Sequence, residues 1–222
     1  MTRVDVWWAR LADYSPGFDR LLSTVEVTRA ARQRRPEDRV RQVLGAIMLR
    51  LAVGAETGRP PDEVVVDRTC PGCAQPHGRP MLPGTGLHAS ITHSADVVGL
   101  ALTRVAPVGL DVERISEIDV ASLSRSVLHG SERAPDLPSF FTYWTRKESV
   151  TKATGDGLRA LLTGVRVSGP DEPPAVVAYP DRGRLPAVMV DLHPGEGYAG
   201  ALTVLTTEPV RVEERLGVLL LQ

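Results

Sequence analysis

The sequence has 222 residues, of which 42% are hydrophobic and 24% charged, and its formal net charge is −1. This length allows one large domain or two small ones with an ordinary buried core. The near-neutral charge argues against sequence-independent binding of nucleic acid, which needs a basic surface, and no apolar run of about 18 residues could span a bilayer. Because the first residues contain no apolar signal-peptide core, we expect a cytoplasmic protein.

Hydrophobic spacing predicts one convincing helix in the first half of the chain. Apolar residues recur at helical spacing from Val40 to Leu51, after Pro36, which suits a first helical turn. We expect this helix over 36–55, ended by Gly54 or Gly58. The other elements expected in this half are a strand over 4–11, a loose helix over 19–34, a short strand over 63–66 within a loop over 58–86, and strands over 89–93 and 97–104.

The second half opens on a strand that alternates strictly. Residues 108–115 place Gly109, Asp111 and Glu113 on one face and apolar side chains on the other. A second convincing helix is predicted over 139–154, with Gly155 and Gly157 as stop signals. The remaining elements expected here are a helix over 119–128 and a series of strands and turns that closes with 198–205.

Two short segments recur in the two halves of the chain. Val4-Asp5-Val6 is echoed by Leu110-Asp111-Val112, and Gly99-Leu-Ala-Leu-Thr103 by Gly200-Ala-Leu-Thr203. This suggests two similar α/β units joined near Pro107, although chance similarity in a chain rich in Val, Ala and Leu explains the echoes equally well. The first copy has Trp7 where the second has Glu113, so we expect acidic chemistry on one side only.

The two cysteines form the motif Cys70-Pro-Gly-Cys73, with His77 four residues further on. Two cysteines and a histidine supply three of the four ligands that a structural zinc ion normally has, and no fourth is evident nearby. From sequence we therefore favour reduced thiols in a loop rich in Pro and Gly over a metal site.

Asp111 and Glu113 are candidate metal ligands. Residues i and i+2 of a strand lie on one face about 7 Å apart, so the two carboxylates can point at the same place. They would repel each other unless a cation lay between them, and oxygen ligands favour Mg²⁺. We expect Gly109 on this face to leave room for a ligand. The alternative is the solvated outer face of an edge strand.

A stripe of side chains along the second predicted helix adds to this pattern. Trp144, Glu148 and Lys152 are spaced i, i+4 and i+8, with Lys147 beside them. One interpretation of the stripe is an ion pair on the helix surface. The other is that it supplies a third carboxylate for a metal ion and an ammonium group that binds a phosphate. Of 26 basic residues, only Lys147 and Lys152 are lysines, and this placement favours the functional interpretation because an ammonium differs from a guanidinium.

These motifs resemble those of a known family. The segments Val108-Gly-Leu-Asp-Val-Glu113 and Trp144-Thr-Arg-Lys-Glu-Ser-Val-Thr-Lys152 are similar to the paired signature of the 4′-phosphopantetheinyl transferases of the surfactin-synthetase-activating (Sfp) type. That signature is Gly-x-Asp-x-Glu followed by Trp-x-x-Lys-Glu-x-x-x-Lys. Pro76-His-Gly-Arg-Pro80 resembles the Gly-Lys-Pro loop of the family, and Ser90-Ile-Thr-His-Ser94 its Ser-x-Ser-His-Ser strand end. The resemblance covers essentially the whole chain.

The resemblance implies an α/β (α+β) fold built as a pseudo-dimer of two similar halves, with the active site in the cleft between them. Residues 1–107 would contribute to coenzyme A binding, and residues 108–222 would carry the metal-binding and catalytic motifs. It also implies transfer of the 4′-phosphopantetheine arm of coenzyme A to a serine of an apo acyl, peptidyl or polyketide carrier protein, with release of adenosine 3′,5′-bisphosphate. We expect a monomer with no nucleic-acid or membrane partner.

The resemblance also assigns site residues. Asp111, Glu113 and Glu148 would hold Mg²⁺, which contacts the diphosphate of coenzyme A. Glu148, or a water on the metal, would take the serine proton, and Lys152 would steady the diphosphate. The other coenzyme A contacts implied are Thr92 and His93 to phosphates, Arg79 to phosphate in place of the usual lysine, and Arg29 to the 3′-phosphate, with Arg32, Arg35 and Arg41 as rivals.

Two other functions remain open at this point. One is a non-catalytic module that binds coenzyme A or a carrier protein. The other is a metal-dependent nuclease, which also uses acidic clusters with a lysine. The net charge of −1 and the absence of an Asp/Glu-x-Lys triplet count against the nuclease.

Overall fold

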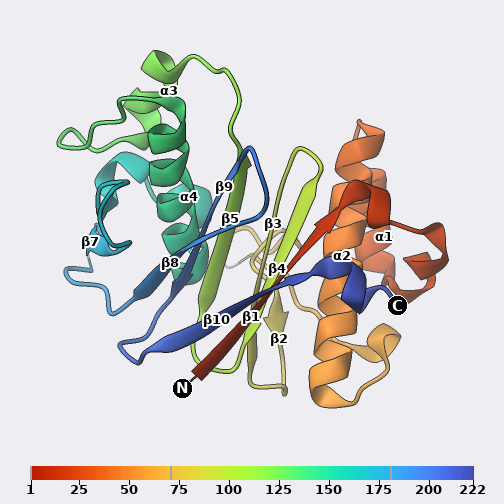
Figure 1. The fold of residues 1–222 in the computed structure, drawn as a ribbon. Coiled ribbons are helices and arrows are strands. Elements are labelled where there is room, and N and C mark those ends of the chain that lie inside the picture. The colour runs from red at the N-terminus through yellow and green to blue at the C-terminus, as the bar shows by residue number, and fades with distance from the viewer. Residues whose placement is uncertain (1, 71, 181) are drawn as a thin grey trace.

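Two β-sheets lie between two long helices, α2 (Pro36–Thr57) and α4 (Leu137–Thr154) (Figure 1). The computed structural model describes residues 2–70, 72–180 and 182–222. The mixed α/β class expected from the sequence is confirmed. No helix among the described residues is long and apolar enough to cross a membrane.

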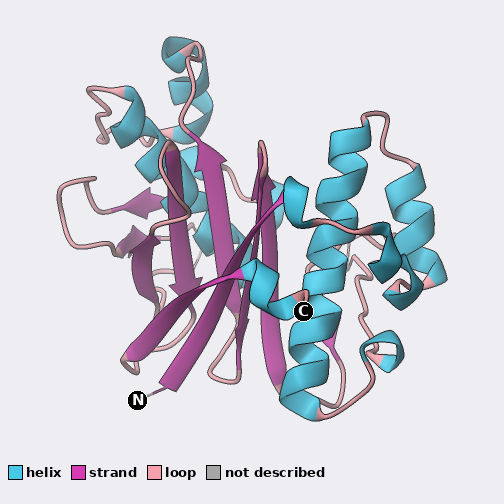
Figure 2. Cartoon of the chain, turned by 45° about the vertical axis from the view of Figure 1, so that its right-hand side comes forward, coloured by secondary structure: helices cyan, strands magenta, loops and turns pink. Residues whose placement is uncertain are grey.

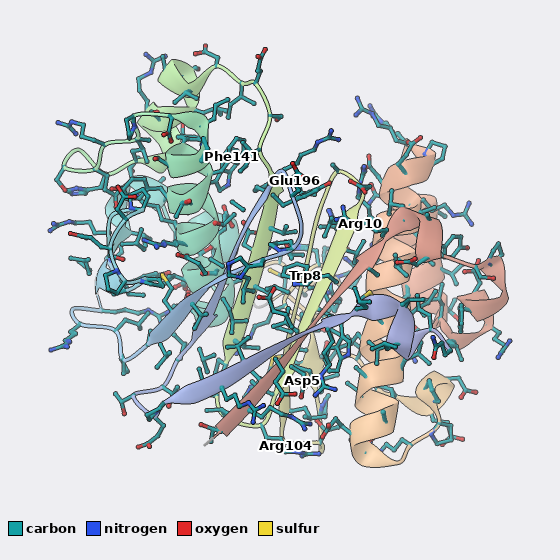
Figure 3. All side chains as sticks on the ribbon, viewed as in Figure 1. Asp5, Trp8, Arg10, Arg104, Phe141 and Glu196 are labelled. Carbon is teal, nitrogen blue, oxygen red and sulfur yellow. The ribbon has the colours of Figure 1, made fainter. Side chains whose placement is uncertain are left out.

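The first sheet contains the strands of the N-terminal half and one strand from the C-terminus. Its parallel pair joins the first strand to the last, and its other pairs are antiparallel. Trp8 Nε1 supports the parallel pair by donating to Glu214 Oε2 at 2.7 Å (Figure 3). The strand order is β10 (Val210–Leu216), β1 (Thr2–Arg10), β4 (Val97–Thr103), β3 (Leu87–Ser94) and β2 (Met81–Leu82).

Helix α2 covers one face of this sheet, and α1 (Thr24–Ala31) packs beside it (Figure 2). Of the two stop signals, Gly58 is the one used: it ends α2 with φ of 72°, a left-handed conformation that glycine adopts without strain. The buried Arg50 of α2 donates to Glu26 of α1 at 2.8 Å, so the two helices are joined by an ion pair as well as by apolar packing.

The second sheet has the order β5 (Val108–Arg114), β9 (Tyr198–Val204) and β8 (Val188–Leu192), with α4 against one face. The expectation that Gly109 leaves room for a ligand is wrong. A Cβ atom at Gly109 would lie 1.9 Å from the backbone oxygen of Ser149, so the glycine lets α4 approach β5. The remaining elements of this half are α3 (Val120–Val127) and the paired short strands β6 (Arg166–Val167) and β7 (Val176–Ala178).

The two sheets pack face to face through an apolar layer. Val4 and Val6 of β1 meet Leu110 of β5 and Leu202 of β9 there, all of them fully buried. Because side chains alternate along a strand, Asp111 lies on the face of β5 opposite to Leu110. This face points toward α4. The alternation predicted for residues 108–115 therefore separates the core from the candidate site.

Hydroxyl groups of β3 join the two sheets at the edge of β5. An edge strand presents unpaired N–H groups, which are costly to bury without a partner. Here alternate serine and threonine side chains of β3 accept from those N–H groups. The bonds run from Leu110 N to Ser90 Oγ at 3.0 Å, from Val112 N to Thr92 Oγ1 at 3.3 Å and from Arg114 N to Ser94 Oγ at 3.1 Å.

Two of the predicted elements differ from the structure. The loose helix over 19–34 is shorter, since a 3-10 turn over Pro16–Leu21 precedes α1, whose first turn is capped by Ser23. The strand over 63–66 is wrong: Pro61–Glu63 form a 3-10 turn and no strand follows directly. The physical reason is that Arg50 Nη1 takes the carbonyl oxygens of this segment, those of Pro61, Asp62 and Val64.

Candidate active site

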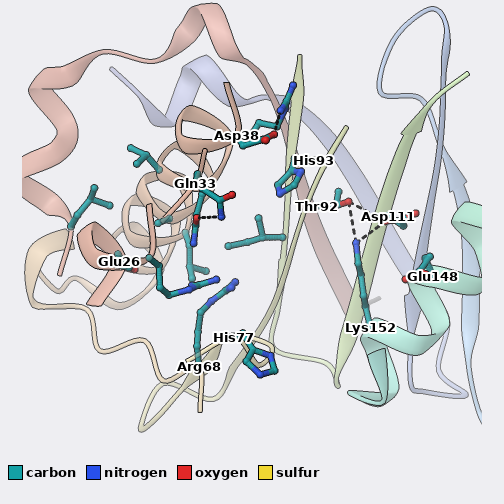
Figure 4. Close-up of a pocket in the computed structure, with 18 of the residues that line it drawn as sticks. Glu26, Gln33, Asp38, Arg68, His77, Thr92, His93, Asp111, Glu148 and Lys152 are labelled. Carbon is teal, nitrogen blue, oxygen red and sulfur yellow. Dashed lines mark hydrogen bonds and ion pairs between the residues drawn. The ribbon is translucent and has the colours of Figure 1, made fainter. Parts of the chain in front are cut away.

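A cavity of about 680 Å³ lies where α1 and α2 face β5 and α4 across β3. Its N-terminal wall includes Arg29, Arg68 and His93, and its C-terminal wall includes Asp111, Glu113, Trp144, Glu148 and Lys152 (Figure 4). The expected stripe of Trp144, Glu148 and Lys152 therefore faces one cavity. Of the site residues predicted from sequence, all but Arg79 line it, and Thr92 lies between the two walls.

Three carboxyl groups line the C-terminal wall. Burial raises the pKa of Asp111, and burial followed by repulsion from Asp111 raises the pKa of Glu113 to about 7. The pKa of Glu148 is raised by the same two causes in the same order. Burial destabilises the charged form of all three groups, and repulsion from Asp111 adds to this at Glu113 and Glu148, so the wall holds more negative charge than its surroundings compensate.

Lys152 partly compensates this charge. Its Nζ donates to Asp111 Oδ1 at 2.6 Å, to Leu110 O at 3.0 Å and to Thr92 Oγ1 at 3.1 Å, which uses all three of its protons. Thr92 in turn donates to Asp111 Oδ1 at 3.1 Å. One oxygen of Asp111 is thus held by two donors, and the other, Oδ2, is buried without a hydrogen-bond partner.

These residues fit a hard cation such as Mg²⁺. Oxygen donors of three carboxyl groups face one cavity, and Asp111 Oδ2 is left unpaired among them. An unpaired buried carboxylate oxygen is costly, and a divalent cation would remove that cost. A site that lacked a cation would be expected to satisfy Oδ2 with a donor from the chain instead.

The N-terminal wall carries an excess of positive charge. Burial and, to a smaller extent, the charge of Arg29 lower the pKa of Arg68 to about 10. Burial also lowers the pKa of Arg29. Glu26, which is paired with Arg50, offsets only part of this effect on the pKa values of the two arginines. Their surroundings favour a bound anion.

Sequence reasoning did not single out Arg68. It stands in the loop before the cysteine motif, and nothing in its spacing distinguishes it from the other arginines of the chain. The rivals to Arg29 are separated by the fold: Arg41 lines the cavity and donates to Ala95 O at 2.5 Å, whereas Arg32 and Arg35 are exposed and are not among the lining residues.

Arg79 lines an adjoining cavity of about 780 Å³ that shares Arg68, His77 and Lys152 with the first. Its Nη1 donates to Ala153 O at 3.0 Å, near the end of α4. His93 projects into the first cavity, where burial and the positive charge of Lys152 lower its pKa. The imidazole is therefore neutral near pH 7 and can donate one hydrogen bond to a ligand.

Lys147 does not belong to this site. Its Nζ is fully buried and contacts Glu132 Oε2 at 2.5 Å, Val127 O at 2.7 Å and Leu162 O at 3.0 Å. Glu132 also accepts from the backbone N–H groups of His129 and Val167. The two lysines of the chain thus lie on different sides of α4, one in the core and one in the cleft.

The raised pKa values predict how stability depends on pH and Mg²⁺. Without metal, the folded protein retains protons on Glu113 up to about pH 7 that the unfolded chain has already lost. The free energy of unfolding should therefore fall as the pH rises from about 4.5 through about 7, and added Mg²⁺ should stabilise most above that range. Urea unfolding at about pH 5 and about pH 8, in EDTA or in Mg²⁺, measures this.

Glu113→Gln removes the titrating group and is expected to flatten the dependence seen in EDTA. An equal effect of Mg²⁺ at both pH values, in the unmodified protein, would contradict the prediction.

Opposed acidic and cationic walls in one cleft are typical of an enzyme that acts on a phosphorylated substrate. The sequence profile described as "4′-phosphopantetheinyl transferase superfamily" matches residues 107–203, which include the whole acidic wall. The 4′-phosphopantetheinyl transferase HetI of Nostoc sp. (strain PCC 7120) is 31% identical over 172 residues, which are 72% of this chain and 70% of that protein. The chain belongs to the 4′-phosphopantetheinyl transferase superfamily.

Two further relatives agree with this assignment. The 4′-phosphopantetheinyl transferase psf-1 of Bacillus pumilus is 26% identical over 186 residues, 79% of this chain and 75% of the relative. The 4′-phosphopantetheinyl transferase gsp of Aneurinibacillus migulanus is 30% identical over 130 residues, 55% of this chain and 51% of the relative. The chain is a 4′-phosphopantetheinyl transferase enzyme, as the sequence motifs predicted.

Proposed function

We propose that this transferase moves the 4′-phosphopantetheine arm of coenzyme A to a serine of an apo carrier protein and depends on Mg²⁺. The observation that carries the proposal is the meeting of Asp111, Glu113 and Glu148 in one cavity with Arg29 and Arg68. Coenzyme A carries a diphosphate and a separate 3′-phosphate, so it needs two cationic regions. The carboxylate wall, once it holds a cation, would supply the region for the diphosphate. The wall with two arginines would supply the region for the 3′-phosphate.

Asp111, Glu113 and Glu148 would hold Mg²⁺. When bound, the ion neutralises negative charge on the diphosphate and on the departing phosphate. Lys152 keeps Asp111 oriented through its bond to Oδ1 and adds a positive charge beside the diphosphate. Thr92, whose hydroxyl bonds Asp111, Lys152 and the backbone of β5, would act on coenzyme A chiefly by fixing that carboxylate.

Glu148 would take the proton of the carrier serine. Its pKa is raised by burial, which brings the carboxylate nearer to the basicity that a general base needs near neutral pH. The serine oxygen then forms a bond to the phosphorus that carries the pantetheine arm. The bond from that phosphorus to the leaving oxygen breaks, and adenosine 3′,5′-bisphosphate departs with the electron pair.

The N-terminal wall would anchor the nucleotide end of coenzyme A. Arg29 binds the 3′-phosphate. Arg68 binds the same phosphate, because the two guanidinium groups are close enough to repel each other and line the same cavity. His93 donates to a phosphate, and Arg79 contacts phosphate from the adjoining cavity. The carrier protein approaches the open side of the C-terminal wall, where Glu148 lies half-buried.

We further propose that the fold is a pseudo-dimer of residues 1–107 and 108–222 that acts as a cytoplasmic monomer. Each half pairs its first strand antiparallel with a later one, β1 with β4 and β5 with β9, which supports the repeat. The division of the chain into halves stays a prediction, and strand β10 returns to pair with β1 in the sheet of the first half.

A mass-shift assay tests the proposed function. Apo acyl, peptidyl and polyketide carrier proteins are each incubated with coenzyme A and Mg²⁺ and weighed by mass spectrometry. A gain equal to one phosphopantetheine group on the carrier serine is expected, and no gain is expected in EDTA. If coenzyme A binds and no carrier gains mass, the chain is a binding module. Cleavage of plasmid that EDTA abolishes would point to a nuclease instead.

The replacement Lys152→Arg separates charge from shape. An ammonium group fits three acceptors in a compact arrangement at Asp111, Thr92 and Leu110, whereas a planar guanidinium does not. We expect transfer to fall by about ten-fold or more while charge is preserved, because Asp111 is then misplaced. Initial rates with saturating coenzyme A measure the effect. An unchanged rate would mean that only the charge at this position matters.

A further inference from the structure

The loop 67–79 contains the two thiol groups and the imidazole group noted in the sequence. It lies between the helices of the N-terminal half and strand β2 along the chain. The ligand atoms of Cys70, Cys73 and His77 all lie within 4.8 Å of one another. Cys73 Sγ and His77 Nε2 are 2.8 Å apart. Around a tetrahedral zinc ion, Zn–S distances of about 2.3 Å and Zn–N distances of about 2.0 Å place ligand atoms about 3.5–3.8 Å apart, within the span of this group. The closer Cys73–His77 pair, which is hydrogen-bonded here, would open slightly around an ion.

The backbone of the loop is folded to hold this arrangement. Cys70 N donates to Gln75 O at 2.9 Å, and Ala74 N donates to Cys70 O at 2.8 Å, so backbone bonds tie Cys70 to the residues that follow Cys73. Ala74 has φ of 58°, a left-handed conformation that costs a non-glycine residue energy. Among the described residues, only Ala95 shares this feature, and it stands in the turn beside the active site.

Thiolate is the form of cysteine that binds metals. Two thiolates and a neutral imidazole around a divalent cation give a neutral site. Such a site adds no charge to a wall of the cleft that already carries the excess positive charge of Arg29 and Arg68.

The loop has no hydrophobic core of its own. Among the described residues of 67–79, no side chain is fully buried, and the buried apolar side chains that flank this stretch along the chain are Val64 and Pro80. A segment that buries so little cannot offset the entropy of ordering it, and a metal ion is one of the usual means of fixing such a segment. Yet this loop holds Arg68 and Arg79 and places His77 in both cavities.

We propose that Cys70, Cys73 and His77 bind one Zn²⁺ ion, with water in the fourth position. This ion would fix the loop that carries Arg68 into the cleft and Arg79 to the adjoining cavity. The site is separate from the carboxylate cluster in both place and chemistry. Soft thiolate ligands select Zn²⁺, whereas the oxygen ligands of the cluster select Mg²⁺. The open fourth position follows from the exposure of Cys73 and His77.

The first test measures metal binding directly. The full chain, purified under reducing conditions and stripped with a chelator, is titrated with Co²⁺ as a spectroscopic substitute for Zn²⁺. We expect one equivalent to give thiolate-to-cobalt charge-transfer absorption and the visible bands of a tetrahedral site, and excess Zn²⁺ but not Mg²⁺ to remove them. Cys73→Ser and His77→Ala should each weaken binding at least ten-fold, while His193→Ala, which changes an exposed histidine elsewhere, should not.

The second test measures the order of the loop without any assay of transfer. Trypsin can cleave after Arg68, whereas Arg79 is followed by Pro80 and resists. Stripping the metal should speed cleavage at the Arg68–Thr69 bond at least several-fold, and Zn²⁺ should restore protection. The Cys73→Ser variant should be cleaved fast with or without Zn²⁺.

Three results would overturn the proposal. The first is the absence of charge-transfer absorption in the reduced wild-type protein. The second is cobalt binding that Cys73→Ser and His77→Ala leave unchanged. The third is a disulfide between Cys70 and Cys73 that persists in protein purified under reducing conditions, because the thiolates would then not be free to bind.

Discussion

Replacing Glu148 by glutamine is expected to lower the rate of transfer by about 10²–10⁴-fold, the usual contribution of a general base. The amide keeps the size of the side chain but can neither accept a proton nor supply a charged oxygen to a cation. Burial and Asp111 already raise the pKa of Glu148, so removing its charge relieves repulsion in the cluster. The folded protein should therefore be no less stable in EDTA than the wild type.

Single-turnover transfer to a carrier protein and urea unfolding measure the two effects. Glu117→Gln is the matched control, because Glu117 is an exposed glutamate outside the lining of the cleft. An active Glu148→Gln enzyme would refute the assignment of the base. A large loss of stability would instead show that the carboxylate has a structural role.

Replacing Lys147 by alanine should have the opposite effects to Glu148→Gln: a large loss in the free energy of unfolding and little change in transfer activity. The change leaves Glu132 charged and buried without its cation and also removes the side-chain donor to the carbonyl oxygens of Val127 and Leu162. Breaking a buried pair by removing one partner costs about 3–5 kcal/mol. The free energy of unfolding from urea titration should fall by that amount, and any protein that still folds should retain transfer activity.

A double variant tests the physical reason for that loss. Lys147→Met with Glu132→Gln removes both charges, so it should be more stable than Lys147→Ala because no buried carboxylate is left unpaired. The single variants complete a double-mutant cycle, and we expect a coupling energy well above 0.5 kcal/mol. A coupling energy near zero would mean that the loss in Lys147→Ala came from the cavity and not from the charge.

The contrast between the two lysines rests on helix geometry. Positions 147 and 152 are five residues apart, and at 3.6 residues per turn they point about 140° away from each other. One therefore enters the core between α4 and the loops around Glu132, and the other enters the cleft. The scarcity of lysine in the sequence drew attention to both, and only Lys152 belongs to the candidate site.

Much of the fold could be predicted because its elements are locally encoded. Helices α2 and α4 have apolar spacing, an early proline and a left-handed glycine at the end, and strand β5 alternates strictly. Where these signals were absent, the predictions were weaker. The segment over 63–66 looked like a strand, but its carbonyl groups are taken by Arg50 from a distant helix.

The sequence by itself determined which side chains of β5 and α4 share a face, because the periods of strands and helices are fixed by the backbone. It therefore placed Asp111 with Glu113 and Glu148 with Lys152. Only the tertiary structure decided that these two pairs meet, that Gly109 serves the close approach of α4, and that Thr92 joins the sheets. It also brought Arg68 to the cleft, since this contact depends on packing between segments that no local spacing records.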